Sequence, residues 1–101
     1  MKFFNVEATF TGNTSVSEEV FKKASADHLD YLQKGFDEGF ILFSGPKTNK
    51  EGGNFVIKGE SLEEIEKYIA GDPLKIYDIQ SYKIIEFKLH DCQPMVREWF
   101  N

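Results

Sequence analysis

Residues 61–73, SLEEIEKYIAGDP, decide the fold of this chain because they contain one complete helix with both of its boundaries. Ser61, followed three residues later by Glu64, forms a capping box that opens the helix. Its apolar residues recur at helical spacing, namely Leu62, Ile65, Tyr68 and Ile69. Gly71 ends the helix, and Asp72-Pro73 has the form of an N-cap with proline at the first helical position. The stretch therefore predicts a helix, a break and a short helical turn in succession.

Strand patterns surround this helix in four segments, Lys2–Phe10, Phe40–Ser44, Asn54–Lys58 and Ile79–Leu89. The first alternates, with Phe4, Val6 and Ala8 on one face. The second is wholly apolar and is stopped by Gly45-Pro46. Residues 47–53 are polar and end in two glycines, which predicts a mobile hairpin connection between the second and third strands.

A second helix is predicted between the first two strands. Residues 11–14 break the first strand, and Ser15 with Glu18 resembles a capping box that opens a helix to about Lys34, with Gly35 at its end. The resulting order is βαββαβ, for which the natural solution is a ferredoxin-like α+β sandwich, two helices on one face of a four-stranded antiparallel sheet. We expect one domain over residues 1–101, with a core of about 1–89 and an irregular tail, 90–101.

The other face of such a sheet would be bare, yet its strands are apolar on both sides. The last strand has Tyr82 and Ile84 on one side and Ile85 and Phe87 on the other. This two-sided pattern predicts that a second copy of the chain covers the open face in a two-fold homodimer, and assembly into a larger homo-oligomer stays open. The alternative is that the tail, through Trp99-Phe100, covers the face itself.

Composition excludes several classes of function. The formal net charge is −5, from 12 basic and 17 acidic residues, with no basic run, so a nucleic-acid partner is not expected. No apolar stretch approaches the ~20 residues that cross a bilayer, and the N-terminus runs into a strand pattern without a signal-peptide core. The single cysteine, Cys92, excludes an internal disulfide and fits a reducing cytoplasm.

No metal site or cofactor is predicted. His28, His90 and Cys92 lack the spacing of a closed zinc site. The pair Gly52-Gly53 precedes a strand and not a helix, so it does not form a phosphate-binding loop.

His28 is the strongest candidate for a catalytic residue in the helix predicted between the first two strands. Its face is otherwise apolar or small, with Phe21, Ala24, Tyr31, Leu32 and Gly35 at helical spacing. An imidazole titrates near neutral pH, and the Asp72 turn could fold back onto it to form an acid–base pair. Taken alone, a histidine on an apolar helix face is more often a core residue, and Asp72 is fully explained as a helix cap, so the residues by themselves leave both readings open.

The order and spacing of several short motifs give the chain a resemblance to the YCII-related family of the dimeric α/β-barrel group. The motifs are His28-Leu29, Tyr31-Leu32, Gly39 to Pro46, residues 61–64, Asp72-Pro73 and Tyr82–Phe87. The resemblance implies a ferredoxin-like fold that dimerises through its sheet, a small-molecule pocket between sheet and helices, and His28 with Asp72 as the active-site pair. It also implies chemistry like that of relatives that remove hydrogen chloride from unsaturated lactones or isomerise muconolactones.

One position departs from the family pattern. Many relatives carry an arginine where this chain has Ser25, and Lys22 and Lys23 are the candidates to replace its charge. The departure bears on the substrate more than on the fold.

The candidate residues suit proton abstraction next to a carbonyl group, because no serine, cysteine or lysine is obviously activated beside His28. The predicted reaction is elimination or isomerisation of a small unsaturated acid or lactone. Ser44, Gly45 and Pro46 are predicted to bind the substrate, with backbone amides stabilising an enolate. The alternative function is a non-catalytic dimeric ligand-binding or assembly module: Ser25 favours the module, whereas His28 with Asp72 favours the enzyme.

Overall fold

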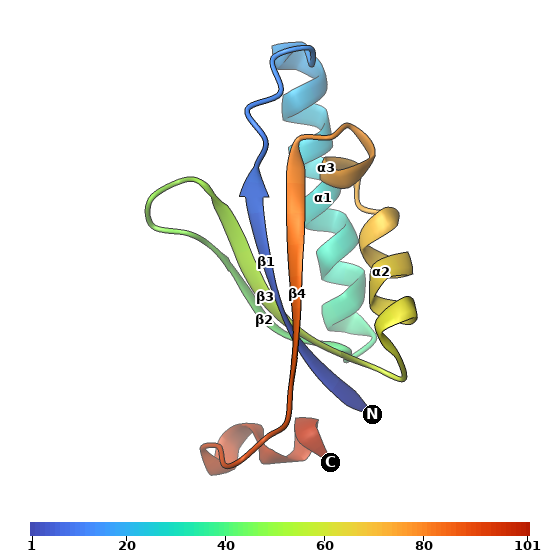
Figure 1. Cartoon of the computed structure of the whole chain (residues 1–101), viewed down its shortest axis with the longest axis vertical. Helices are drawn as coiled ribbons and strands as arrows, with labels where there is room; N and C mark the ends of the chain where they lie inside the picture. The colour runs from blue at the N-terminus through green and yellow to red at the C-terminus, as the bar shows by residue number, and fades with distance from the viewer.

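The computed structural model describes residues 1–101 and has helices on one face of a four-stranded sheet (Figure 1). In chain order its elements are β1 (Lys2–Phe10), α1 (Glu18–Asp37), β2 (Ile41–Pro46), β3 (Gly52–Gly59), α2 (Leu62–Ala70), α3 (Pro73–Ile76), β4 (Gln80–Phe87) and a 3-10 helix, η1 (Pro94–Phe100). The sheet order is β2-β3-β1-β4, with every neighbouring pair antiparallel. The predicted ferredoxin-like α+β sandwich is confirmed. None of the helices combines the length and apolar composition that a bilayer crossing needs.

The core lies between the sheet and the helices. Strand register places Phe4 opposite Ile57 and Val6 opposite Phe55 on the helix-facing side. All four side chains are buried in one cluster with residues of α1 and α2. The alternation read from β1 therefore sets which face of the sheet carries the site.

The start of α1 differs from the prediction. Ser17, and not Ser15, is the N-cap, and its hydroxyl accepts a hydrogen bond from the Val20 amide at 3.1 Å. Ser15 instead donates to the side chain of Asn13 at 2.6 Å and belongs to the preceding turn. Ser17 is followed directly by two glutamates of the first turn, where the helix dipole favours negative charge.

The end of α1 also lies later than predicted. Gly35 lies inside the helix, where an added Cβ would overlap Ile41, so glycine is required there for close packing against β2. The left-handed residue after the helix is Gly39, with φ of +83°. A glycine needed for packing and a glycine that ends a helix cannot be told apart by residue type alone.

The boundaries of α2 and α3 agree with the prediction. The Ser61 hydroxyl accepts from the Glu64 amide at 3.2 Å, and the Glu64 carboxylate accepts in return from the Glu60 amide at 2.8 Å. Asp72 caps α3 by accepting from the Leu74 amide at 2.9 Å, with Pro73 at the first helical position. Each cap of this kind typically contributes about 1 kcal/mol.

Strands β2 and β3 are longer than predicted. Gly45 and Pro46, read as the stop that follows the second strand, belong to β2, and both Gly52 and Gly53, read as loop, belong to β3. Gly52 has φ of +144°, and a Cβ there would overlap the carbonyl oxygen of Ala8. This close backbone approach needs glycine and brings the hairpin against β1 beside the cavity described below.

The tail does not remain irregular, because residues 94–100 form η1 beyond the end of β4 (Figure 1). Trp99 and Phe100 pack on Phe3 of the open sheet face, with ring centroids 5.8 and 4.8 Å away. Trp99 is also held by its indole N–H, which donates to the Gly39 carbonyl at 2.8 Å. The tail thus covers one end of the open face.

Apolar surface remains on the rest of that face. The side chains of Phe43 and Ile85 are 52% and 43% exposed.

Candidate functional site

His28 and Asp72 meet, although 44 residues separate them in the chain. The His28 Nδ1 atom lies 2.7 Å from Asp72 Oδ2 and 2.9 Å from Oδ1. An ionised carboxylate only accepts hydrogen bonds, so Nδ1–H donates and the lone pair of the neutral imidazole is on Nε2. Asp72 is only 2% exposed and its Oδ1 also caps α3, so its position is fixed by two contacts.

Two stacked tyrosines hold the Asp72 turn against α1. The rings of Tyr31 on α1 and Tyr68 on α2 lie 4.8 Å apart at an angle of 19°. Each hydroxyl donates to the backbone carbonyl of the other residue, at 2.7 Å from Tyr31 and 3.3 Å from Tyr68. A Cβ on Gly71 would overlap the Tyr31 hydroxyl, so the backbone packs closely against Tyr31 of α1 one residue before Asp72.

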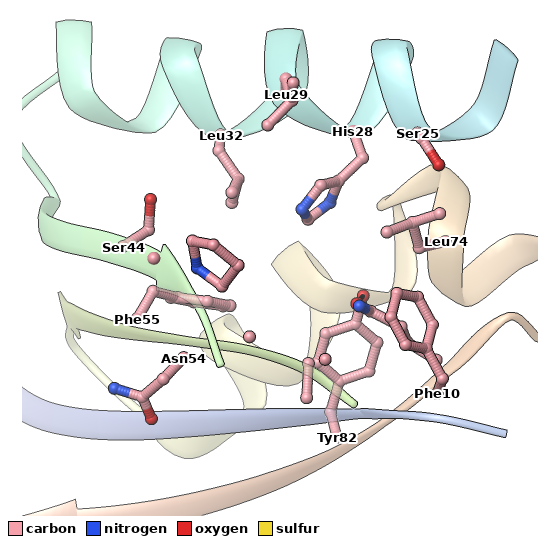
Figure 2. A pocket seen from close by; sticks show the side chains of 16 residues that line it. Phe10, Ser25, His28, Leu29, Leu32, Ser44, Asn54, Phe55, Leu74 and Tyr82 are labelled. Carbon is pink, nitrogen blue, oxygen red and sulfur yellow. Dashed lines mark hydrogen bonds between the residues drawn. The ribbon is translucent and has the colours of Figure 1, made fainter. Parts of the chain in front are cut away.

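A cavity of about 290 Å³ opens between α1 and the sheet, with the imidazole of His28 in its wall (Figure 2). Helix α1 contributes Ser25, Leu29 and Leu32 beside His28, and the predicted residues Ser44, Gly45 and Pro46 line the β2 side. Asp72 lies behind His28 and does not line the cavity. His28 Nε2 makes no hydrogen bond within the chain.

Strand β4 adds two cavity residues that the sequence did not single out. Tyr82 and Gln80 both line the cavity, and the Tyr82 hydroxyl donates to Gln80 Oε1 at 3.1 Å. Burial raises the pKa of Tyr82, and the negative charge of Asp72 raises it further. The phenol therefore stays neutral, as a hydrogen-bond donor. The sequence does contain a signal for these two residues, because the alternation of β4 places both polar side chains on the inward face of the sheet.

Burial and the charge of Asp72 also raise the pKa values of the stacked pair Tyr31 and Tyr68, which we call the tyrosine clamp. Burial and then the charge of Asp72 raise the pKa of Tyr31. Burial also raises the pKa of Tyr68, followed by the influence of Tyr31 and Asp72. The negative charge of Asp72 thus adds to the effect of burial at all three phenols.

The lysines that were candidates to replace a cavity arginine do not reach the cavity. Lys22 pairs with Glu18 at 3.4 Å and Lys23 with Asp27 at 3.1 Å, all on the surface of α1. Ser25 itself lines the cavity. Nowhere do three or more His, Cys, Asp or Glu side chains gather as metal ligands would, and His90 and Cys92 lie beyond the end of β4.

Fold and site together define a ferredoxin-like domain with a histidine–carboxylate pair at a small internal cavity. The model of the YCII-related domain matches residues 6–88, and the chain belongs to this family. No protein of curated function matches the chain significantly.

Two solved structures share the fold. Muconolactone isomerase, at 15% identity, superposes with a TM-score of 0.76, covering 91% of this chain and 94% of its own. The 5-chloro-2-hydroxyhydroquinone dehydrochlorinase from Burkholderia phenoliruptrix, in complex with 2,5-dihydroxybenzoquinone, has 20% identity and a TM-score of 0.67. That match covers 85% of this chain and 93% of the dehydrochlorinase.

Proposed function

We propose that this protein is a small-molecule enzyme in which His28 acts as general base and general acid, oriented by Asp72. The reaction is elimination or isomerisation of a small unsaturated acid or lactone. The observation that carries the proposal is the Asp72 carboxylate on His28 Nδ1, with Nε2 unbonded at a cavity. A base within reach of substrate and oriented by a second group is the usual arrangement for proton transfer.

The proposed steps use only this pair. The Nε2 lone pair removes a proton from the carbon next to the substrate carbonyl, and the C–H electrons move to the carbonyl oxygen to form an enolate. In an isomerisation, Nε2–H returns the proton to the far carbon of the conjugated system as the carbonyl re-forms. In an elimination, the enolate electrons expel a leaving group with its bonding pair. Asp72 stabilises the imidazolium between the two steps.

An enolate also needs a donor, since general base catalysis typically contributes only about 10²- to 10⁴-fold. Tyr82 is the side chain best suited, because it lines the cavity and its neutral hydroxyl would exchange its bond to Gln80 Oε1 for one to the enolate oxygen. Backbone amides of Ser44 and Gly45 are further candidates on the opposite strand. The names of the two structural relatives, a dehydrochlorinase and an isomerase, are consistent with these two outcomes of one enolate.

We also infer that the enzyme works as a homodimer formed through the open sheet face. The exposed apolar side chains of Phe43 and Ile85 support this assembly. A single cysteine, with no partner for an internal disulfide, suits the cytoplasm as its location.

The first test is turnover of unsaturated lactones by the wild type and by His28→Asn. The asparagine amide can still donate to the buried Asp72, so the fold should hold while the base is lost. We expect turnover to fall at least 10²-fold with an unchanged melting temperature. His90→Asn, at an exposed histidine, is the matched control. The opposite outcome is that neither the wild type nor His28→Asn turns over a lactone, while both bind it equally well. That result would support the ligand-binding module instead.

A further inference from the structure

The cavity wall carries no lysine or arginine side chain. Its polar side chains are Ser25, His28, Ser44, Asn54, Gln80 and Tyr82. The fixed charge beside it is negative, namely the buried carboxylate of Asp72 directly behind His28. A carboxylate placed here would lose hydration without gaining a permanent counter-ion, which is strongly unfavourable.

Three lysines on or next to the elements that line the cavity pair with other groups. Lys47, which follows β2, donates to the Thr9 hydroxyl at 3.1 Å and lies 3.7 Å from Glu7 Oε2. Thr9 and Glu7 alternate with the buried residues of β1 and so belong to the open face of the sheet. Lys22 and Lys23 lie on the surface of α1, as described above. The structure therefore places no permanently charged cation in the cavity wall.

The rest of the cavity wall is largely apolar, and the cavity itself is small. Leu32, Phe55 and Leu74 line it, and Leu29, 66% exposed, is at its outer side. Phe10 lines the cavity and packs against Phe21 of α1, with ring centroids 6.2 Å apart. A volume of about 290 Å³ lies just below the roughly 300–1,000 Å³ of typical ligand sites, so a molecule of one ring fits.

Building on the proposed function, we infer that the substrate enters uncharged, as a single-ring unsaturated lactone or similarly neutral ring carbonyl compound, and not as a carboxylic acid. The hydroxyl and amide groups of the wall orient its oxygen atoms. The one negative charge on the ligand is then that of the enolate, which forms in the same step in which His28 becomes a cation by taking the proton. The cavity thereby discriminates by charge before any chemistry occurs.

The test uses two isosteric probes, a butenolide ring bearing an acetate side chain and the same ring bearing the acetamide. Dissociation constants are measured at pH 8 from the NMR signals of His28 and Tyr82. At this pH the acetate is ionised, whereas the acetamide carries no charge. We expect the acetamide to bind at least tenfold more tightly than the acetate.

Ser25→Arg tests the cause. It places a cation at the cavity wall one helical turn before His28 and should raise acetate affinity at least tenfold, reversing the order of the probes. Ala26→Arg adds the same charge at an exposed position of the same helix and should leave the order unchanged. Circular dichroism establishes that both variants fold.

Each other outcome has a distinct meaning. Acetate binding as tightly as acetamide in the wild type would overturn the inference about charge and leave the proposed enzyme intact. A folded Ser25→Arg variant with no gain for the acetate would show that charge is not what discriminates. If neither probe perturbs the His28 or Tyr82 signals, the proposed function itself fails.

Discussion

The two oxygens of Asp72 have different roles at the scale of single residues. Oδ1 accepts from the Leu74 amide and lies 2.9 Å from His28 Nδ1, whereas Oδ2 is the closer oxygen, at 2.7 Å. Asp72 is thus both a helix cap and the partner of the imidazole. A substitution that preserves one role and removes the other can separate structure from chemistry.

Asp72→Asn is that substitution. The asparagine oxygen should keep the bond to Leu74, because asparagine caps helices as well as aspartate. Its NH₂ group then takes the place of Oδ2 and can only donate, so His28 should move its proton to Nε2. We expect nitrogen-15 NMR to show the reversed tautomer, with turnover about 10²- to 10⁴-fold lower and stability nearly unchanged. An imidazole that keeps its proton on Nδ1 in this variant would contradict the assignment.

The packing of α1 against α2 is the feature that matters at the scale of elements. Stacking between Tyr31 and Tyr68 and the absence of a side chain at Gly71 bring the Asp72 turn to His28. These contacts lie between residues far apart in the chain. They make the site depend on helix packing as well as on the pair itself.

Gly71→Ala tests this dependence. Its φ is −88°, which alanine adopts freely, so the effect should arise from the overlap with the Tyr31 hydroxyl alone. We expect a loss of about 1–3 kcal/mol in the free energy of unfolding, measured by urea denaturation. Gly45→Ala, where an added Cβ meets nothing within 4 Å, is the matched control for stability. Equal effects of the two substitutions would argue against a close-packed clamp.

The same clamp predicts a dependence of stability on alkaline pH. Burial raises the pKa of Tyr68 above the unfolded value of about 10, so the unfolded chain releases this proton first as the pH rises. Its contribution is therefore complete below pH 10 and is lost progressively above it. We expect Tyr68→Phe to flatten the fall in melting temperature above pH 10, with Tyr77→Phe as the control at an exposed tyrosine. A slope that stays the same in Tyr68→Phe would contradict the burial of this hydroxyl.

Particular residues show how far the sequence predicts the site. Alternation in β1 and the Ser61 capping box depend on neighbours in the chain, and both were predicted correctly. The choice of Ser17 over Ser15 is a competition between caps two residues apart, which residue type does not decide. Helical spacing turned His28 inward, but its contact with Asp72 spans 44 residues and was anticipated from the family resemblance. Tyr82 and Gln80 went unnoticed because a polar pair on an inner strand face acquires meaning only beside a cavity.

At the scale of the whole molecule, the open sheet face can be covered either by the C-terminal tail or by a second copy of the chain. Trp99 and Phe100 cover one end of it, around Phe3, while Phe43 and Ile85 stay exposed. The tail therefore does not replace a second copy of the chain over the whole face.

Ile85→Glu decides between these two arrangements. In a dimer formed through the sheet, the substitution would bury a carboxylate opposite an apolar face, so we expect light scattering to report a dimer for the wild type and a monomer for the variant. The fold of each monomer should persist, because Ile85 does not belong to the core between sheet and helices. Lys88→Glu, beyond the end of β4, changes charge at an exposed position and should leave the dimer intact. A monomeric wild type would instead mean that the tail gives the open face sufficient cover, and that the cavity works within a single chain.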